Sequence, residues 1–317
     1  MSHEAPYPWL HRMAWLTAII ALLPISVGAV VTTVDAGMAF ADWPTSRGQG
    51  MFQFPWWQSH GDEFLEHGHR LAGALTGMVT LALAGMAATT RCSREIRIVV
   101  AAILLVVILQ GLLGGWRVVA DRRVIALLHA VFAAVVFSLM AVLVLMTSRG
   151  WSMATVGEGP ETRTALAGGI VLLVVLSIQY VLGSLLRHLG LAQAWLVHPW
   201  FALIVLAAAV VFCGLLMRTA APGLRIAGWW VLGIVLAQGA LGLLTWGVRY
   251  GFPEWGIMAV QQSPLQVAVR SLHKVLGLLT YMSTVVALAR LWHASPPRGV
   301  GTDVVQTPLG LAAGGLT

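Results

Sequence analysis

The sequence predicts an all-α integral membrane protein whose eight transmembrane helices form two pseudo-symmetric four-helix bundles. Three observations lead to this fold class: 58% of the 317 residues are hydrophobic, 10% are charged, and the mean hydropathy is +0.84. A soluble domain carries about 25% charged residues, so the composition excludes an ordinary water-soluble enzyme. The apolar content excludes disorder, and the presence of only two cysteines excludes a disulfide scaffold.

Eight apolar stretches are each long enough to cross a bilayer. An α-helix rises about 1.5 Å per residue, so a hydrocarbon core of about 30 Å needs about 20 apolar residues. Helices are expected because lipid offers no water to exposed backbone groups, and the stretches are too long for barrel strands. The predicted spans are residues 14–34, 65–88, 97–117, 124–146, 165–186, 195–217, 227–247 and 271–291.

The segments outside the spans carry their own signals. The first apolar run is long, and no clear small-residue cleavage site follows it, so we expect a helix and not a cleaved signal peptide. Three tryptophans in the segment 35–63 are typical of a membrane–water interface. We expect the segment at about 248–270 to contain an amphipathic helix on the membrane surface. The tail after about residue 293 is rich in proline and glycine and is expected to be mobile.

The basic residues indicate the orientation. With the N-terminus inside, ten of the 19 Lys and Arg residues fall in inner segments. Several of the others lie at outer helix ends beside histidines, where they are candidates for binding a ligand and do not decide topology. We therefore expect both termini in the cytoplasm and the protein in the cell (inner) membrane. The formal charge of +7 is spread along the chain without a long basic run, so no nucleic acid partner is expected.

A repeated motif predicts an internal duplication. In the third, fifth and seventh spans, a glutamine is followed four residues later by a glycine, which places both on one helix face. Glycine at such a position lets another helix or a flat ligand approach closely, so these residues are expected to pack helices or to face a ligand. The three pairs are Gln110 and Gly114, Gln179 and Gly183, and Gln238 and Gly242. Their positions predict two halves, residues 1–150 and 151–317.

Four histidines lie inside predicted spans, one in each even-numbered span: His69, His129, His198 and His273. The even spans all run inward in the expected topology, so the four imidazoles share one depth near the outer face. A single histidine in a membrane commonly makes an interhelical hydrogen bond, but it is also a functional candidate. Four at equal depth favour two pairs of axial haem ligands, one pair in each half. Zinc is less compatible, because its ligands gather around one point and often include thiols or carboxylates.

Charged residues near the outer helix ends complete the candidate site. Glu66 lies three residues before His69 on the same helix face, where it is a candidate catalytic carboxylate. It is suited to orient an imidazole, relay protons or stabilise positive charge, although a solvated carboxylate at a helix start is the simpler alternative. Cations at this end are candidates for binding haem propionates, with interfacial anchoring as the alternative. They are Arg70, Arg117, Arg187, Arg249, Arg270 and Lys274. His60, His67 and His188 are expected in loops.

The pattern resembles the haem A synthase family over residues 14–291. The most specific motif is Glu66-x-x-His69-Arg70 at the start of the second span. Supporting motifs are Asp42-Trp43-Pro44 and Gln110-Gly111-x-x-Gly114-Gly115-x-Arg117. The resemblance implies oxidation of the C8 methyl of haem O, through an alcohol, to the formyl group of haem A for cytochrome oxidase. It also implies that His198 and His273 bind haem b as the electron-transfer cofactor, that His69 and His129 frame the substrate haem O, and that Glu66 is needed for activity.

Two departures from the family pattern bear on these expectations. Many relatives carry a cysteine pair in an outer loop, whereas Cys92 falls in a predicted inner loop and Cys213 near the inner end of the sixth span. We therefore expect no outer disulfide. Lys274 follows His273 where an arginine is expected, and an ammonium is a point charge instead of a bidentate fork.

Other functions are compatible with bis-histidine sites in a helical bundle. One is a two-haem, cytochrome b-like electron carrier linked to the quinone pool, and another is a haem chaperone or transporter. The expected partners are haem O as substrate, the farnesyltransferase that produces it, an electron donor such as quinol, and the lipid bilayer.

Overall fold

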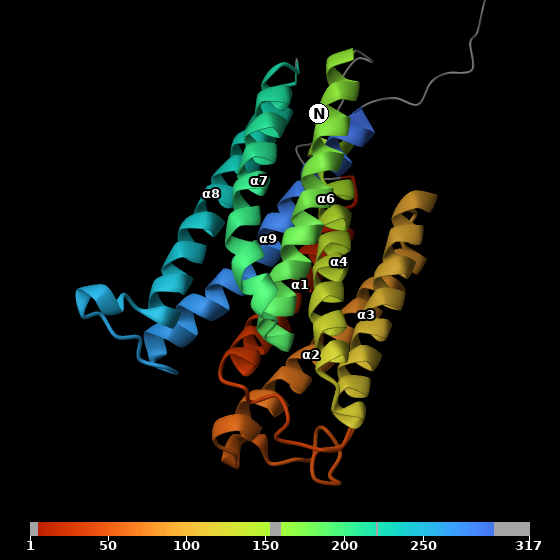
Figure 1. Cartoon of the computed structure of the whole chain (residues 1–317). Helices are drawn as coiled ribbons and strands as arrows, with labels where there is room; N and C mark the ends of the chain where they lie inside the picture. The colour runs from red at the N-terminus through yellow and green to blue at the C-terminus, as the bar shows by residue number, and fades with distance from the viewer. Residues whose placement is uncertain (1–5, 153–159, 220, 295–317) are drawn as a thin grey trace, which may run out of the picture.

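The computed structural model describes residues 6–152, 160–219 and 221–294. Within these residues it is all-helical, and eight helices are long and apolar enough to cross a membrane (Figure 1). The predicted fold class of a multi-pass helical membrane protein is thereby confirmed. The eight helices are α1 (Pro8–Thr33), α2 (Gly61–Thr89), α3 (Arg94–Ala120), α4 (Arg123–Met146), α6 (Pro160–Leu189), α7 (Ala192–Met217), α8 (Pro222–Tyr250) and α9 (Pro264–Ala294).

Every predicted span is found, and each helix begins before the apolar run that predicted it. Some of these added residues are polar ones that a hydropathy count leaves out, such as Asp62 and Glu63 at the start of α2. A short helix, α5 (Arg149–Ser152), follows α4. The predicted tail lies outside the described residues beyond Ala294, and the division of the chain into two pseudo-symmetric halves remains a prediction.

Local sequence signals account for several helix ends. The Ser93 side chain accepts a hydrogen bond from the Ile96 N–H at 3.3 Å and caps α3. Proline opens α8 at its first position, where a backbone N–H has no helical partner in any case. Gly251 ends α8 with a φ of +70°, a conformation in which a side chain would be strained.

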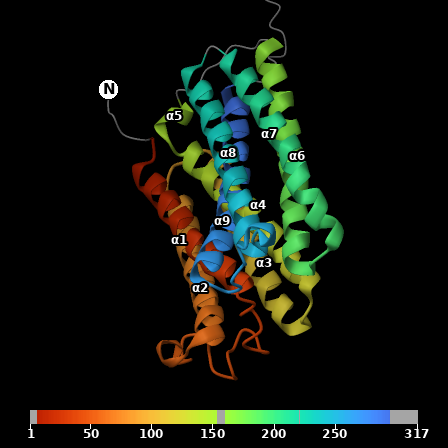
Figure 2. The same ribbon diagram turned by 60° about the vertical axis from the view of Figure 1, so that its left-hand side comes forward.

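The long helices pack as two connected groups. Consecutive helices contact each other within α1–α4 and within α6–α9, and α9 packs against α1, α4 and α6 as well as α8. Figure 2 shows the same helices in a second view, in which α9 of the second group lies next to helices of the first group. One hydrophobic cluster is built by α1–α4 with Leu278 of α9, and a second is built by α6–α9. Large apolar side chains on the outer faces are exposed, as a lipid-facing surface requires.

Two longer connections lie at one end of the helices (Figure 1). The first joins α1 to α2 and includes the 3-10 turn η1 (Trp56–Gln58), and the second joins α8 to α9 and includes η2 (Pro253–Trp255). The predicted amphipathic helix in the second connection is wrong. Gly251 and Gly256 have positive φ values that interrupt a helix, and residues from Pro264 onward already belong to α9.

Glycines set the closest helix packing. A Cβ at Gly169 on α6 would lie 2.5 Å from Leu288 Cδ2 and 2.7 Å from Phe212 Cε2. We therefore expect Gly169→Val to overpack this contact and lower the free energy of unfolding by about 1–3 kcal/mol. Thermal unfolding of the detergent-solubilised protein measures the effect. Gly77→Val on α2, where a Cβ meets open space, is the matched control. Equal unfolding temperatures for both variants would contradict this account of the packing.

Candidate functional site

The structure brings the four span histidines together as two pairs. The rings of His69 on α2 and His129 on α4 have centroids 6.2 Å apart and planes at 80°. His198 on α7 and His273 on α9 have centroids 6.4 Å apart and planes at 86°. An imidazole nitrogen lies about 2 Å from a bound transition metal, so two rings on opposite sides of one ion have centres roughly 6 Å apart. Both pairs therefore have the spacing that bis-imidazole ligation of a single ion needs.

The pairs are not parts of larger ligand clusters. Among the described residues, no group of three or more His, Cys, Asp or Glu side chains is arranged to hold a metal ion. The two cysteines, Cys92 and Cys213, are buried and free.

Each paired histidine faces a glycine on a neighbouring helix. A Cβ built on that glycine would lie 2.8 to 3.2 Å from the Cε1 atom of the imidazole, so no larger residue fits without movement. The four contacts are Gly28 with His69, Gly114 with His129, Gly183 with His198, and Gly242 with His273. Three of these glycines belong to the repeated motif that the sequence singled out. Gly28 was missed, because the residue four positions earlier is Pro24 instead of glutamine.

A buried ion pair adjoins the first histidine pair. The Glu66 carboxylate is 3% exposed and accepts hydrogen bonds from Arg70 Nη2 at 2.8 Å and from the Ala39 N–H at 2.7 Å. Arg70 also donates to the carbonyl oxygens of Asp42 (2.9 Å) and Thr45 (2.7 Å). Glu66 is therefore not a solvated residue at a helix start, since α2 begins five residues before it.

Among the described residues Glu66 is the only buried acid, so the second histidine pair has no counterpart to it. Helices α7, α8 and α9 contain no Asp or Glu, and the sole acid of α6 is Glu161 in its first turn. The two pairs thus share ligand geometry but differ in their ionisable neighbours. A buried acid requires a partner to be tolerated, so its presence beside one pair alone indicates a local role.

His67 belongs to α2, and the prediction that it lies in a loop is wrong. It is fully buried, and its ring nitrogens lie 2.9 Å from Ser46 Oγ and 3.0 Å from the Met51 carbonyl oxygen. His67 therefore ties the connection between α1 and α2 to the helix turn that carries Glu66 and His69. His188 likewise lies in the last turn of α6 instead of a loop, whereas His60 directly precedes α2.

The predicted cations differ in their surroundings. Arg187 of α6 donates to the Ala29 carbonyl oxygen at 2.7 Å and to the hydroxyls of Thr32 and Thr33, all on α1. The guanidinium of Arg117 lies against Gly37 in the connection between α1 and α2, and Lys274 directly follows His273 on α9. Arg249 is exposed and bonds Gln261 in the connection between α8 and α9. Arg270 lies near Arg249.

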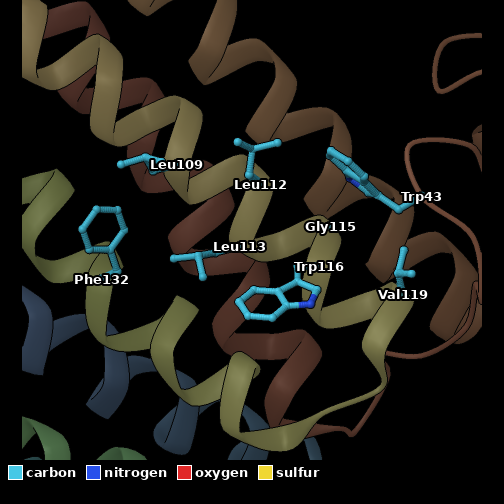
Figure 3. Close-up of a pocket in the computed structure, with 8 residues that line it drawn as sticks. All are labelled: Trp43, Leu109, Leu112, Leu113, Gly115, Trp116, Val119 and Phe132. Atoms are coloured by element: carbon cyan, nitrogen blue, oxygen red, sulfur yellow. The ribbon is translucent and has the colours of Figure 1, made fainter.

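An apolar groove of about 670 Å³ lies on the outer side of α3 (Figure 3). The Trp43 ring covers Gly115 there, and a Cβ on that glycine would overlap the ring. Leu112, Trp116 and Val119 are more than half exposed, so the groove faces the lipid instead of the histidine pairs. Its lining is Trp43, Leu109, Leu112, Leu113, Gly115, Trp116, Val119 and Phe132.

The fold and the paired histidines define a multi-pass helical membrane protein in which four histidines of the long helices form two pairs. The chain belongs to the COX15-CtaA family, described as cytochrome oxidase assembly protein, whose family model matches residues 11–196. This match includes His69 and His129 and ends two residues before His198.

Three relatives are each named heme A synthase. The chain is 30% identical to the protein of Rhizobium rhizogenes over 43% of this chain and 39% of the relative. It is 27% identical to the protein of Symbiobacterium thermophilum over 58% of this chain and 61% of the relative. It is 27% identical to the protein of Staphylococcus epidermidis over 47% of this chain and 49% of the relative. The matches therefore span between 39% and 61% of the relatives' lengths.

The Asp42 carboxylate holds the connection between α1 and α2 in a pH-dependent way. Hydrogen bonds from the Thr45 hydroxyl (2.6 Å) and from the Gly48 (2.8 Å) and Arg47 (3.0 Å) N–H groups lower the pKa of Asp42 from 3.8 to about 2. Because the folded-state pKa is depressed, the stabilisation is complete above about pH 4 and is lost as the pH falls towards about 2.

We expect the amide protons of residues 42–48 to lose protection from hydrogen exchange in that acid window, after correction for intrinsic rates. Asp42→Ala should lack this protection already at neutral pH, and trypsin should then cleave after the exposed Arg47 faster than in the unchanged protein. Protection of the unchanged protein that stays constant from pH 3.8 to about 2 would show that the carboxylate does not hold this segment.

Proposed function

We propose that the chain is a haem A synthase, a membrane-bound oxidoreductase that converts the C8 methyl of haem O to a formyl group through a hydroxylated intermediate. The observation that carries the proposal is the presence of two histidine pairs with bis-imidazole spacing, of which only one has a buried acid beside it. Family membership and the names of the relatives support the same reaction.

The residues between α7 and α9 fit haem b as the cofactor. His198 and His273 have the required separation, and Gly183 and Gly242 let their imidazole rings lie close against the neighbouring helices. The Nδ1 atoms of both histidines are buried and have no hydrogen-bond partner among the described residues. Haem b, when bound, would supply one-electron transfer.

The residues between α2 and α4 fit haem O as the substrate. His69 and His129 would hold it axially, with Gly28 and Gly114 beside the rings. Side chains do not supply the oxidising power that a methyl C–H bond requires, so the protein's part is to bind, orient and handle protons. Glu66 is the group suited to proton handling there, because its carboxylate is buried and held in place by Arg70 and the Ala39 N–H.

Cations around the two pairs are suited to the haem propionates. Arg117 and Lys274 would serve the first pair together with Arg70, which Glu66 holds in the helix turn next to His69. Arg187 lies four residues after Gly183, which faces His198, and Arg270 lies three residues before His273, so these two would serve the second pair. Arg249 completes the proposed set, although its side chain bonds Gln261. We further propose that both termini are cytoplasmic and that the haem sites lie near the outer face of the cell membrane. Farnesyltransferase and a quinol would serve as the source of haem O and of electrons.

A cytochrome b-like electron carrier is the competing function. It would need two bis-histidine sites but no buried acid at one of them, so the Glu66–Arg70 pair favours the synthase. Extraction of pigments from the purified protein, expressed with a source of haem O, distinguishes the two. Haem A or its hydroxylated precursor supports the synthase, and haem b as the sole pigment under active expression supports the carrier.

Glu66→Gln should lower haem A formation by about 100-fold or more, the range typical of a lost acid or base. The amide keeps the side-chain shape but cannot exchange protons in the same way. Haem b content, read from the absorption spectrum, should stay unchanged. The matched control is Glu63→Gln on the first turn of α2, where the carboxylate pairs with the exposed Arg47. Full haem A formation by Glu66→Gln at normal haem content would remove this carboxylate from the mechanism.

Gly183→Val should lower the haem b content to a small fraction of the unchanged protein, because a Cβ there would lie 2.9 Å from His198 Cε1. Haem content per protein after purification is the measurement. Gly214→Val on α7 is the control, since a Cβ at that position meets open space. Normal haem content in Gly183→Val would show that this close approach is not part of the cofactor site.

A further inference from the structure

Three glutamines lie beside three of the paired histidines in the same way. Each is on the neighbouring helix, four residues before the glycine that faces the imidazole, and its Nε2 donates to the main-chain carbonyl oxygen of the histidine. The bonds are Gln110 to His129 (3.0 Å), Gln179 to His198 (2.9 Å) and Gln238 to His273 (3.1 Å).

In each of these pairs one polar atom of each partner remains unused. The Oε1 atom of the glutamine and the Nδ1 atom of the histidine are buried without a hydrogen-bond partner among the described residues. A buried polar atom left unpaired is costly. The same unused acceptor and unused ring nitrogen recur in all three pairs, which points to a bond that forms only when the proton is fixed on Nδ1.

His69 shows the completed arrangement. Its Nδ1 lies 2.9 Å from the Pro24 carbonyl oxygen on α1, and Pro24 stands four residues before Gly28, where the other helices carry glutamine. A carbonyl oxygen can only accept, so Nδ1 carries the proton and Nε2 keeps its lone pair. This is the tautomer of an imidazole that ligates a metal through Nε2.

We infer that Gln110, Gln179 and Gln238 are positioning residues whose Oε1 atoms accept the Nδ1–H of their histidines during haem ligation. The Pro24 carbonyl oxygen accepts the Nδ1–H of His69 in the same way. The inference rests on the proposed function, because ligation through Nε2 is what places the proton on Nδ1. An acceptor at Nδ1–H orients the ring and makes it a more basic ligand, which favours ferric over ferrous iron.

The chemistry of glutamine explains its use at these positions. A carboxamide offers a donor and an acceptor on one rigid plane. The donor anchors the side chain to the main chain of the ligand helix, and the acceptor remains available for Nδ1–H. Helix packing alone would use the donor and leave the acceptor unpaired inside a lipid-spanning segment, where polar groups are costly.

Two substitutions of Gln238 in the full-length, haem b-loaded protein test the inference. Gln238→Met keeps the length but removes the acceptor, so the midpoint potential of haem b should rise. Gln238→Glu provides a stronger acceptor, so the potential should fall. The electron paramagnetic resonance spectrum of the ferric haem should move in opposite directions in the two variants. Gln193→Met and Gln193→Glu, at an exposed position on α7, should leave both measurements unchanged.

Shifts of one sign in both Gln238 variants, or no shift in either, would overturn the inference. If Gln238→Met loses haem, Gln179→Met is the alternative variant, because Gln179 bonds His198, the other proposed ligand of haem b. Gln179→Met should also raise the midpoint potential of haem b. The result also separates the two proposals. Unmoved potentials in haem-loaded variants would refute the role of the glutamines alone, whereas an unchanged protein that binds no haem would refute the proposed function as well.

Discussion

The close approach between an imidazole and the backbone of a neighbouring helix is the constraint on which both histidine pairs depend. Lipid provides no hydrophobic force between helices, so their separation is set by packing and interhelical hydrogen bonds. At three of the four paired histidines, a glycine and a glutamine one turn apart on the neighbouring helix provide these interactions. The glycine contacts the imidazole ring, and the glutamine donates a hydrogen bond to the main-chain carbonyl oxygen of the histidine. This fixed helix separation in turn sets the distance between the rings of each pair.

A second constraint comes from charge that is buried beside the first pair. The turn of α2 that carries Glu66, His67 and Arg70 uses all three side chains to bind the connection from α1. Because each of these polar groups would be costly if left unpaired, the connection and the helix turn are held as one unit. In the part of the chain that the structure describes, no buried acid lies on α6–α9, so the two pairs share a similar ring spacing but differ in their ionisable neighbours.

Much of this arrangement could be predicted from the sequence, because the signals were local. Hydropathy located all eight helices, and the four-residue spacing of glutamine and glycine singled out three of the four glycines that contact a histidine in the structure, although it did not predict the histidine as the partner. Gly28 was not predicted because no glutamine stands four residues before it. The main-chain carbonyl of Pro24 contacts His69 there instead, and a main-chain group cannot be recognised from the residue type. His67 was misplaced because hydropathy does not register the polar first turns of α2, and its burial depends on the fold of the preceding connection.

Arg187 has a consequence for how the whole chain works as a unit. It stands one turn after Gly183, which faces His198, yet its guanidinium bonds the Ala29 carbonyl oxygen next to Gly28, which faces His69. The hydrogen bonds of this one side chain therefore connect α6, which contacts the second histidine pair, to α1, which contacts the first pair. A fragment limited to either group of four helices would lack one end of this tie, so neither site can be regarded as an independent module.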